Sequence, residues 1–293
     1  MALMQNLATF LRRHALVICA LLAVVGVLVV GLRPAGQSEP SAAETAAAAA
    51  AISFTPHRAL YDLKLQSIKP NGNINNVQGK MLFAWDDACE GWTIEQRLDM
   101  NYEYEGGGSQ NSKTSLATWE AKDASMFRFS VRRETNGEAT EEFRGQAVLA
   151  NGGGTAHYTT PKERDVKLPS TTLFPSVHTL ELLRKAKAGE HVYTREVFDG
   201  ADEQGRNFIS AFISNPVVIE APKDAVNAEL QQGRAWPVRM AFYAPENQAG
   251  TPDYEMTMML LENGVATSLT IDYGDFVVSA TLKNVEPLAR TCS

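Results

Sequence analysis

The sequence is poor in the residues that build most catalytic and metal sites. Its 293 residues include only five histidines and three cysteines. A zinc site normally needs such ligands at short, regular spacing, and a thiol redox centre needs paired cysteines. No Cys-x-x-Cys motif is present, so we expect no metal, no cofactor and no redox chemistry. The histidines beyond the N-terminal region stand singly, at His57, His157, His178 and His191.

Two further absences concern enzymes and nucleic acids. No Gly-x-Ser-x-Gly nucleophile elbow is present, and the glycine runs 106–108 and 152–154 lie between expected strands instead of opening a helix. Positive charge is also scarce, because 27 Lys and Arg stand against 34 Asp and Glu. Nucleic-acid binding usually needs a basic face. The sequence therefore favours a protein that is not an enzyme and binds no nucleic acid.

Long apolar runs are missing except near the N-terminus. Arg12 and Arg13 precede an apolar stretch at 15–32, as in an export signal. We interpret residues 1–34 as a signal peptide or an N-terminal membrane anchor, because the stretch is just long enough to span a bilayer. The domain that follows is therefore expected outside the cytoplasm, and at the inner membrane if the signal is not cleaved.

The segment between the signal and the domain has no core-forming pattern. Residues 35–51 are rich in Ala, Ser and Glu and are predicted to be a flexible, Ala-rich tether. The run 46–51 contains several Ala-x-Ala frames, so cleavage is expected there in preference to an uncleaved anchor. The remaining residues, 52–293, are predicted to form one domain.

Export also decides how the cysteines are interpreted. Cys19 lies within the apolar stretch, which leaves Cys89 and Cys292 in the exported domain. An even pair of cysteines in an oxidising compartment predicts a disulfide bond.

Alternation of apolar and polar residues with period two dominates the domain. In the first expected strand, Tyr61, Leu63 and Leu65 alternate with polar side chains. Asn136-Gly137 and Asn263-Gly264 predict tight hairpin turns. Consecutive short strands joined in this way form an antiparallel meander, and about a dozen strands in one sheet should curl. The predicted fold is mainly β, with a single curled antiparallel sheet in the form of a spiral or half-barrel.

One segment, 168–190, contains the only convincing helix of the domain. Pro175 is tolerated at a helix entry, and Ser176 is predicted to be the N-cap. Gly189 can take the left-handed conformation that ends a helix. Such a central amphipathic helix should bury its apolar face against the sheet. That face carries Val177, Leu180, Leu183 and Ala186.

Aromatic and leucine side chains raise the question of a cavity inside the curled sheet. A curled sheet can enclose an apolar ligand, although aromatic residues more commonly fill an ordinary core. The residues considered as cavity lining are Tyr61, Phe83, Trp85, Trp92, Phe127, Phe129, Leu180, Leu183, Trp236 and Phe242.

Several short motifs together resemble the EipB-like cell-envelope-integrity family of secreted proteobacterial proteins. The resemblance covers roughly residues 52–293 and rests on the combination of the motifs. They are His57-Arg58-Ala59-x-Tyr61-x-Leu63-x-Leu65, Gly79-x-Met81, Cys89-x-Gly91-Trp92 with Gln96-Arg97, Leu168-Pro169 with Phe174-Pro175-x-x-His178, Val197-Phe198-Asp199-Gly200, and the terminal Cys292.

The resemblance implies a periplasmic protein with a spiral-like, many-stranded sheet and a disulfide between Cys89 and Cys292. It also implies a role in envelope maintenance and a periplasmic tetratricopeptide-repeat partner. The function expected first is non-enzymatic maintenance of cell-envelope integrity through protein–protein contacts. The alternative is a carrier or sensor of an apolar ligand, such as a lipid or a lipoprotein acyl chain.

Overall fold

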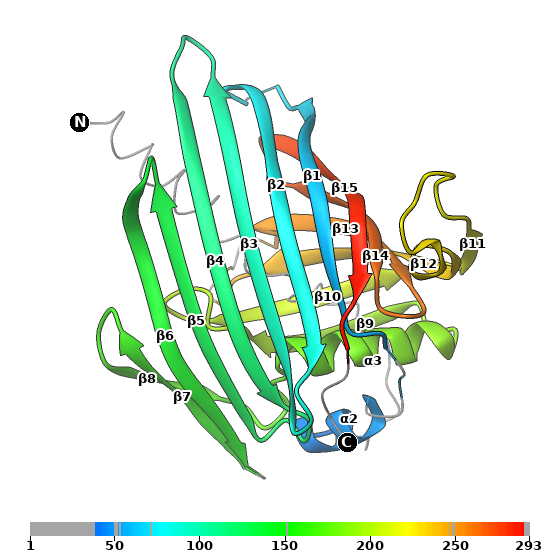
Figure 1. Cartoon of the computed structure of the whole chain (residues 1–293). Coiled ribbons are helices and arrows are strands. Elements are labelled where there is room, and N and C mark those ends of the chain that lie inside the picture. Colours follow the sequence, from blue (N-terminus) through cyan, green and yellow to red (C-terminus); the bar gives the residue numbers. More distant parts are fainter. Residues whose placement is uncertain are drawn as a thin grey trace.

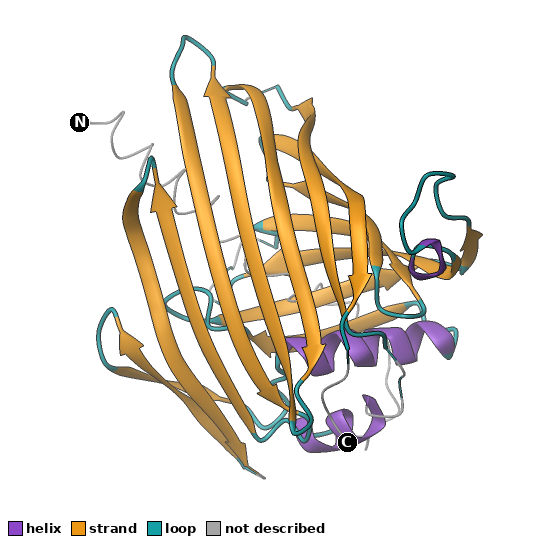
Figure 2. Cartoon of the chain, viewed as in Figure 1, coloured by secondary structure: helices purple, strands orange, loops and turns teal. Residues whose placement is uncertain are grey.

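The computed structural model describes residues 39–49, 52, 54–70, 72–150, 152–245, 247 and 250–289. Within these residues one antiparallel sheet of 15 strands is accompanied by the helices α2 and α3 and by the short 3-10 helix η2 (Figures 1 and 2). In chain order the elements are α2 (Ala42–Ala49), β1 (His57–Ile68), β2 (Ile74–Asp87), β3 (Gly91–Tyr104), β4 (Ser109–Ala121), β5 (Met126–Thr135), β6 (Glu138–Ala150), β7 (Gly153–Thr160), β8 (Arg164–Leu168), α3 (Pro175–Lys187), β9 (Val192–Phe198), β10 (Arg206–Ile213), β11 (Val217–Ile219), η2 (Ala228–Leu230), β12 (Gly233–Tyr243), β13 (Tyr254–Leu261), β14 (Ala266–Asp272) and β15 (Phe276–Pro287).

Strands β1 to β8 form one meander and the strands from β9 to β15 form another. The two meanders are joined where β1 pairs with β15. The order across the sheet is β8-β7-β6-β5-β4-β3-β2-β1-β15-β14-β13-β12-β10-β9, and β11 adds to β12. The long strands β2 to β6 stand upright in Figure 1, whereas β9, β10, β12 and β13 cross behind them at a steep angle. The predicted fold class, a single curled antiparallel sheet, is confirmed.

The two ends of the sheet meet through the segment that links β8 to α3. The N–H of Leu173 donates to the carbonyl of Glu196 at 2.9 Å, and the N–H of Phe198 donates to the carbonyl of Leu173 at 2.9 Å. A chain segment that leaves one edge strand therefore bonds to the other edge strand. The sheet nearly closes on itself, and fewer backbone groups remain unpaired at its edges.

Helix α3 lies across the lower end of the curled sheet (Figure 1). The apolar face predicted from the sequence is buried, and so are His178 and Glu181 on the same helix. The predicted N-cap is wrong: the cap position is Phe174, Pro175 is the first helical residue, and Ser176 lies inside the first turn. The cap is supplied instead by Glu120 of β4, whose two carboxylate oxygens accept from the backbone N–H groups of Ser176 and Val177, at 2.6 and 2.9 Å.

Part of the predicted flexible tether is an ordered helix. In α2 the residues Ala42, Thr45, Ala46 and Ala49 are buried, and the helix packs against α3. Alanine has the highest helix propensity, and a capping box formed by Ser41 and Glu44 begins this helix. The prediction of a tether over 35–51 is therefore wrong for 42–49.

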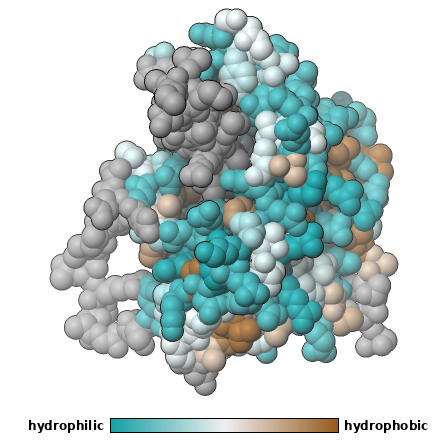
Figure 3. Space-filling view, turned by 90° about the vertical axis from the view of Figure 1, so that its left-hand side faces the viewer, coloured by the Kyte–Doolittle hydropathy of each residue, from teal (hydrophilic) through white to brown (hydrophobic). Residues whose placement is uncertain are grey.

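The predicted signal or anchor, residues 1–34, lies outside the described residues. None of the helices in the described part of the chain has the length and hydropathy needed to span a membrane. The face of the molecule turned to the viewer in Figure 3 is mainly hydrophilic, and hydrophobic residues occupy separate areas on it. This distribution is that of a domain whose apolar side chains are turned into the sheet.

Candidate functional site

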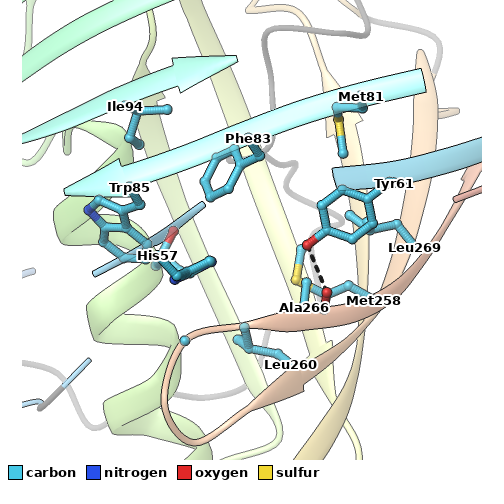
Figure 4. A pocket seen from close by; sticks show the side chains of 12 residues that line it. His57, Tyr61, Met81, Phe83, Trp85, Ile94, Met258, Leu260, Ala266 and Leu269 are labelled. Carbon is cyan, nitrogen blue, oxygen red and sulfur yellow. Dashed lines mark hydrogen bonds between the residues drawn. The ribbon is translucent and has the colours of Figure 1, made fainter. Parts of the chain in front are cut away.

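An apolar cavity of about 40 Å³ lies inside the curled sheet, beside the middle of α3. Figure 4 shows Phe83, Trp85 and Ile94 on one side of it and Met258 and Leu260 on the hairpin opposite. Alternation along β1 to β3 turns one side chain in two toward this interior. The cavity therefore lies between the upright strands β1 to β3 and the strands β13 and β14, beside Thr179 of α3.

Three polar side chains of the lining bond to backbone carbonyls. The Tyr61 hydroxyl donates to the carbonyl of Ala266 at 2.8 Å, and the Thr179 hydroxyl donates to that of Pro175 at 3.1 Å. His57 Nδ1 lies 2.8 Å from the carbonyl of Thr55, so this nitrogen carries the proton. Burial lowers the pKa of His57, which favours the neutral ring. The lining is thus mainly apolar, and the buried indole N–H of Trp85 has no hydrogen-bond partner within the described residues.

The sequence-predicted lining divides into two groups in the structure. Tyr61, Phe83 and Trp85 line this cavity. Phe54, which was not predicted, covers Trp85 with ring centroids 4.3 Å apart and brings Trp92 to its other side at 4.8 Å. The curl of the sheet carries the remaining predicted residues into other parts of the core, so they do not line this cavity: Trp92, Phe127, Phe129, Leu180, Leu183, Trp236 and Phe242.

A second aromatic cluster marks the place where the ends of the sheet meet. Phe127 and Phe129 of β5 pack against Phe198, with ring centroids 6.1 and 5.6 Å apart. Phe174, at the entry to α3, stacks on Phe127 at 5.0 Å. Gly200 has φ +67°, and an added Cβ would lie 2.5 Å from the Phe129 ring. The Val197–Gly200 motif therefore needs its glycine for both its backbone conformation and its packing.

Buried charged residues lie close to the place where the ends of the sheet meet, and they were not predicted from the sequence. Arg133 of β5 is 2% exposed and donates to Glu141 and to the carbonyl of Ala201, at 2.8 and 2.7 Å. Asp199 accepts from the N–H of Ala201 at 2.8 Å. Burial, with a smaller contribution from the charge of Asp202, raises the pKa of Asp199 to about 7. The sequence did contain a signal for the burial of Arg133, because this residue alternates in phase with the apolar residue Val131 of the same strand.

Cys89 lies in the turn between β2 and β3, has φ +66° and is disulfide-bonded. Cys292 lies outside the described residues, so its pairing with Cys89 stays a prediction. The register brings the chain close to the position that this pairing requires, because His57 lies opposite both Pro287 of β15 and Trp85 of β2. Two strand spacings amount to about 10 Å, and five residues beyond Pro287 can span about 17 Å.

We predict that neither Cys89 nor Cys292 reacts with an alkylating reagent in the unreduced, exported protein. Peptide mapping should find the two cysteines in one cross-linked peptide pair, and reduction should make both available. Cys19, if the signal is retained, serves as an internal control because it has no predicted partner. Alkylation of Cys292 without reductant would exclude the pairing.

Three comparisons relate the chain to known proteins. A model described as EipB-like matches residues 48–289. The cell envelope integrity protein EipB of Brucella abortus (strain 2308) is 30% identical over 247 residues, which are 83% of this chain and 88% of that protein. The crystal structure of a beta-barrel-like protein from Brucella abortus, described as a domain of unknown function, has a TM-score of 0.76 and 28% identity and covers 82% of this chain and 100% of its own.

Proposed function

The chain belongs to the EipB-like family, and from this membership we propose that it is a periplasmic, non-enzymatic protein that maintains cell-envelope integrity through protein–protein contacts. The observation that carries the proposal is the 30% identity, over 247 residues, to a protein named for cell-envelope integrity. The predicted signal peptide or anchor at residues 1–34 supports the periplasmic location. The cavity lining is mainly apolar, and its His57, Tyr61 and Thr179 side chains bond to backbone carbonyls, which supports a role without catalysis.

The outer face of β9 and β10 supports the protein contacts. Val192 and Phe212 lie opposite each other in the sheet and are 56% and 58% exposed. Phe208 lies on the same face of β10 and is 37% exposed. Single exposed apolar residues are ordinary, but neighbouring ones mark interaction surfaces. We name these three residues the β9–β10 patch and assign it to a periplasmic partner protein, which the resemblance indicates is a tetratricopeptide-repeat protein.

The test is complementation of a strain that lacks this protein, grown under detergent stress. We expect the deletion to increase detergent sensitivity and the intact chain to restore resistance. The double variant Val192→Ser/Phe212→Ser should reach the same cellular level and fail to restore resistance. Lys64→Ser, an exposed change on β1, is the matched control and should restore it fully. Unchanged sensitivity of the deletion strain would contradict envelope maintenance, and full rescue by the double variant would contradict the patch.

The alternative function, a carrier or sensor of a lipid or lipoprotein acyl chain, rests on the apolar cavity. At about 40 Å³ the cavity is far smaller than the roughly 300–1,000 Å³ of sites that enclose organic ligands. A lipid would enter only if the side chains around Phe83 and Met258 moved apart. Native mass spectrometry of the protein purified from its own envelope separates the two functions: bound lipid favours the carrier, whereas a stoichiometric protein partner without lipid favours protein contacts.

A further inference from the structure

The N-terminal segment 39–49, which we name the clasp, is built into the fold as a helix with a buried face. In α2 the exposed fractions of Ala42, Ala46 and Ala49 are 3%, 2% and 0%. These side chains recur at the spacing of one helix face, and α2 packs against α3 (Figure 1). Small residues on this face allow the two helices to approach closely.

Both the start of the clasp and its flank are fixed by specific polar contacts. The Ser41 N–H donates to the Glu44 carboxylate at 2.8 Å, and the Glu44 N–H donates to the Ser41 hydroxyl at 3.3 Å. The N–H of Ala42 donates to the carbonyl of Ser170 at 2.9 Å, in the segment that closes the sheet. An unattached tether would not donate to Ser170, so the clasp has a defined position on the domain.

The strongest contact of the clasp is an ion pair with a buried cation. Arg195 of β9 has a side chain that is 7% exposed, and its Nη1 lies 3.0 Å from the Glu39 carboxylate. Glu39 is the carboxylate that the described part of the chain pairs with this guanidinium. The Glu39 side chain is 42% exposed, so solvent weakens the pair, but removing Glu39 would leave the buried guanidinium without this carboxylate. Glu39 therefore contributes to neutralising Arg195.

The two elements that the clasp contacts, α3 and β9, carry buried polar side chains. His178 of α3 and Tyr193 of β9 stack with ring centroids 5.3 Å apart, and Arg195 lies over the Tyr193 ring at 6.0 Å. The imidazole nitrogens of His178 and the Tyr193 hydroxyl are buried and make no hydrogen bond within the described residues. The clasp therefore lies against elements that bury polar as well as apolar side chains.

We propose that residues 39–49 remain in the exported protein, docked on α3 and β9, and that the export signal is not cut within 46–51. A cut there would remove Glu39 and Ala42 from their sites and expose Arg195. The match to the family model begins at residue 48, so most of the clasp precedes the matched residues.

The first test is the intact mass and N-terminal sequence of the protein recovered from the periplasmic or membrane fraction. We expect a polypeptide that still contains Glu39, whether the signal is cut before this residue or retained. An N-terminus at residue 47–52 would overturn the proposal. This measurement uses the wild-type chain, so it does not depend on the folding of a variant.

The second test measures how firmly the clasp is seated. Glu39→Gln should lower the melting temperature of the exported protein by about 3 °C, because it leaves Arg195 without a charged partner. Glu203→Gln removes an exposed carboxylate from the loop before β10 and should leave the melting temperature unchanged. Equal melting temperatures for Glu39→Gln and the wild type would mean that the clasp is not docked through this pair and would overturn the proposal.

Discussion

Replacing Glu120 by alanine is expected to lower the free energy of unfolding by about 3 kcal/mol. Glu120 is 1% exposed, and its carboxylate accepts from the first two available N–H groups of α3, at 2.6 and 2.9 Å. Pro175, the first helical residue, has no N–H to satisfy. Alanine would leave two buried donors unpaired, each costing about 1–3 kcal/mol, and would remove a negative charge from the positive end of the helix. Part of that loss is offset, because the variant does not have the unfavourable free energy of burying a carboxylate.

Denaturant unfolding at neutral pH measures this effect. Glu95→Ala is the matched control, because Glu95 is an exposed glutamate on the neighbouring strand β3. We expect the control to change the free energy of unfolding by less than about 0.5 kcal/mol. If Glu120→Ala unfolds at the same denaturant concentration as the control, another group must cap α3 in solution.

The course of the chain through the sheet could be predicted because its signals are local. At Asn136 and Gly137 the φ angles are +52° and +86°, as the predicted tight turn requires. Gly264 likewise has φ +90° in the turn between β13 and β14. Alternation along the strands then decides which side chains face the interior. The resemblance to the EipB-like family, read from short motifs, is confirmed by the match over residues 48–289.

The helix cap could not be predicted from the segment that it caps. Ser176 has a suitable side chain, but the hydrogen bonds come from Glu120, 56 residues earlier in the chain. Such a contact depends on how the sheet curls, and turn signals do not fix that curl. A hint was present, because Glu120 is in phase with the buried residues Leu116 and Thr118 of β4. A carboxylate at a core-facing position needs a buried partner, even when the sequence does not identify it.

The cavity lining was predicted only in part, and the clasp was mispredicted, for related reasons. The aromatic residues of β1 to β3 and those of β5 all face inward, but the curl separates them into two clusters, around Trp85 and around Phe127. Composition alone made the alanine-rich segment resemble a tether. A helix as short as α2 is marginal by itself and forms because α3 and Arg195 provide a surface for it. Both outcomes depend on contacts between residues that are distant in sequence.

Replacing His178 by phenylalanine is expected to stabilise the protein at acidic pH, by about 3 kcal/mol at pH 4 relative to the wild type. His178 is fully buried, its ring stacks on Tyr193, and neither ring nitrogen has a hydrogen-bond partner within the described residues. Burial, helped by the positive charge of Arg195, lowers the pKa of His178 to about 3. Phenylalanine has a similar shape and leaves no buried polar atom unpaired.

The direction of this pH dependence follows from the linkage between proton binding and folding. The folded pKa of His178 is lower than the unfolded value of 6.5, so the unfolded state binds a proton that the folded state does not. The stability contribution is complete above pH 6.5 and declines as the pH falls toward 3. Glu120 acts in the opposite direction, because burial raises its pKa to about 7 and its contribution is lost as the pH rises from 4.5 through that value. The wild-type curve therefore combines opposing effects, and the difference between variant and wild type isolates His178.

Denaturant unfolding of both proteins from pH 4 to pH 8 provides that difference. Gln78→Phe, at an exposed position on β2 whose side chain does not titrate, is the control and should give a difference that varies little with pH. For His178→Phe the difference should be small at pH 7 and grow steadily below pH 6. A difference that stays constant with pH would mean that the buried imidazole becomes positively charged in the folded protein as readily as in the unfolded protein. That outcome would contradict the burial of both ring nitrogens without a hydrogen-bond partner within the described residues.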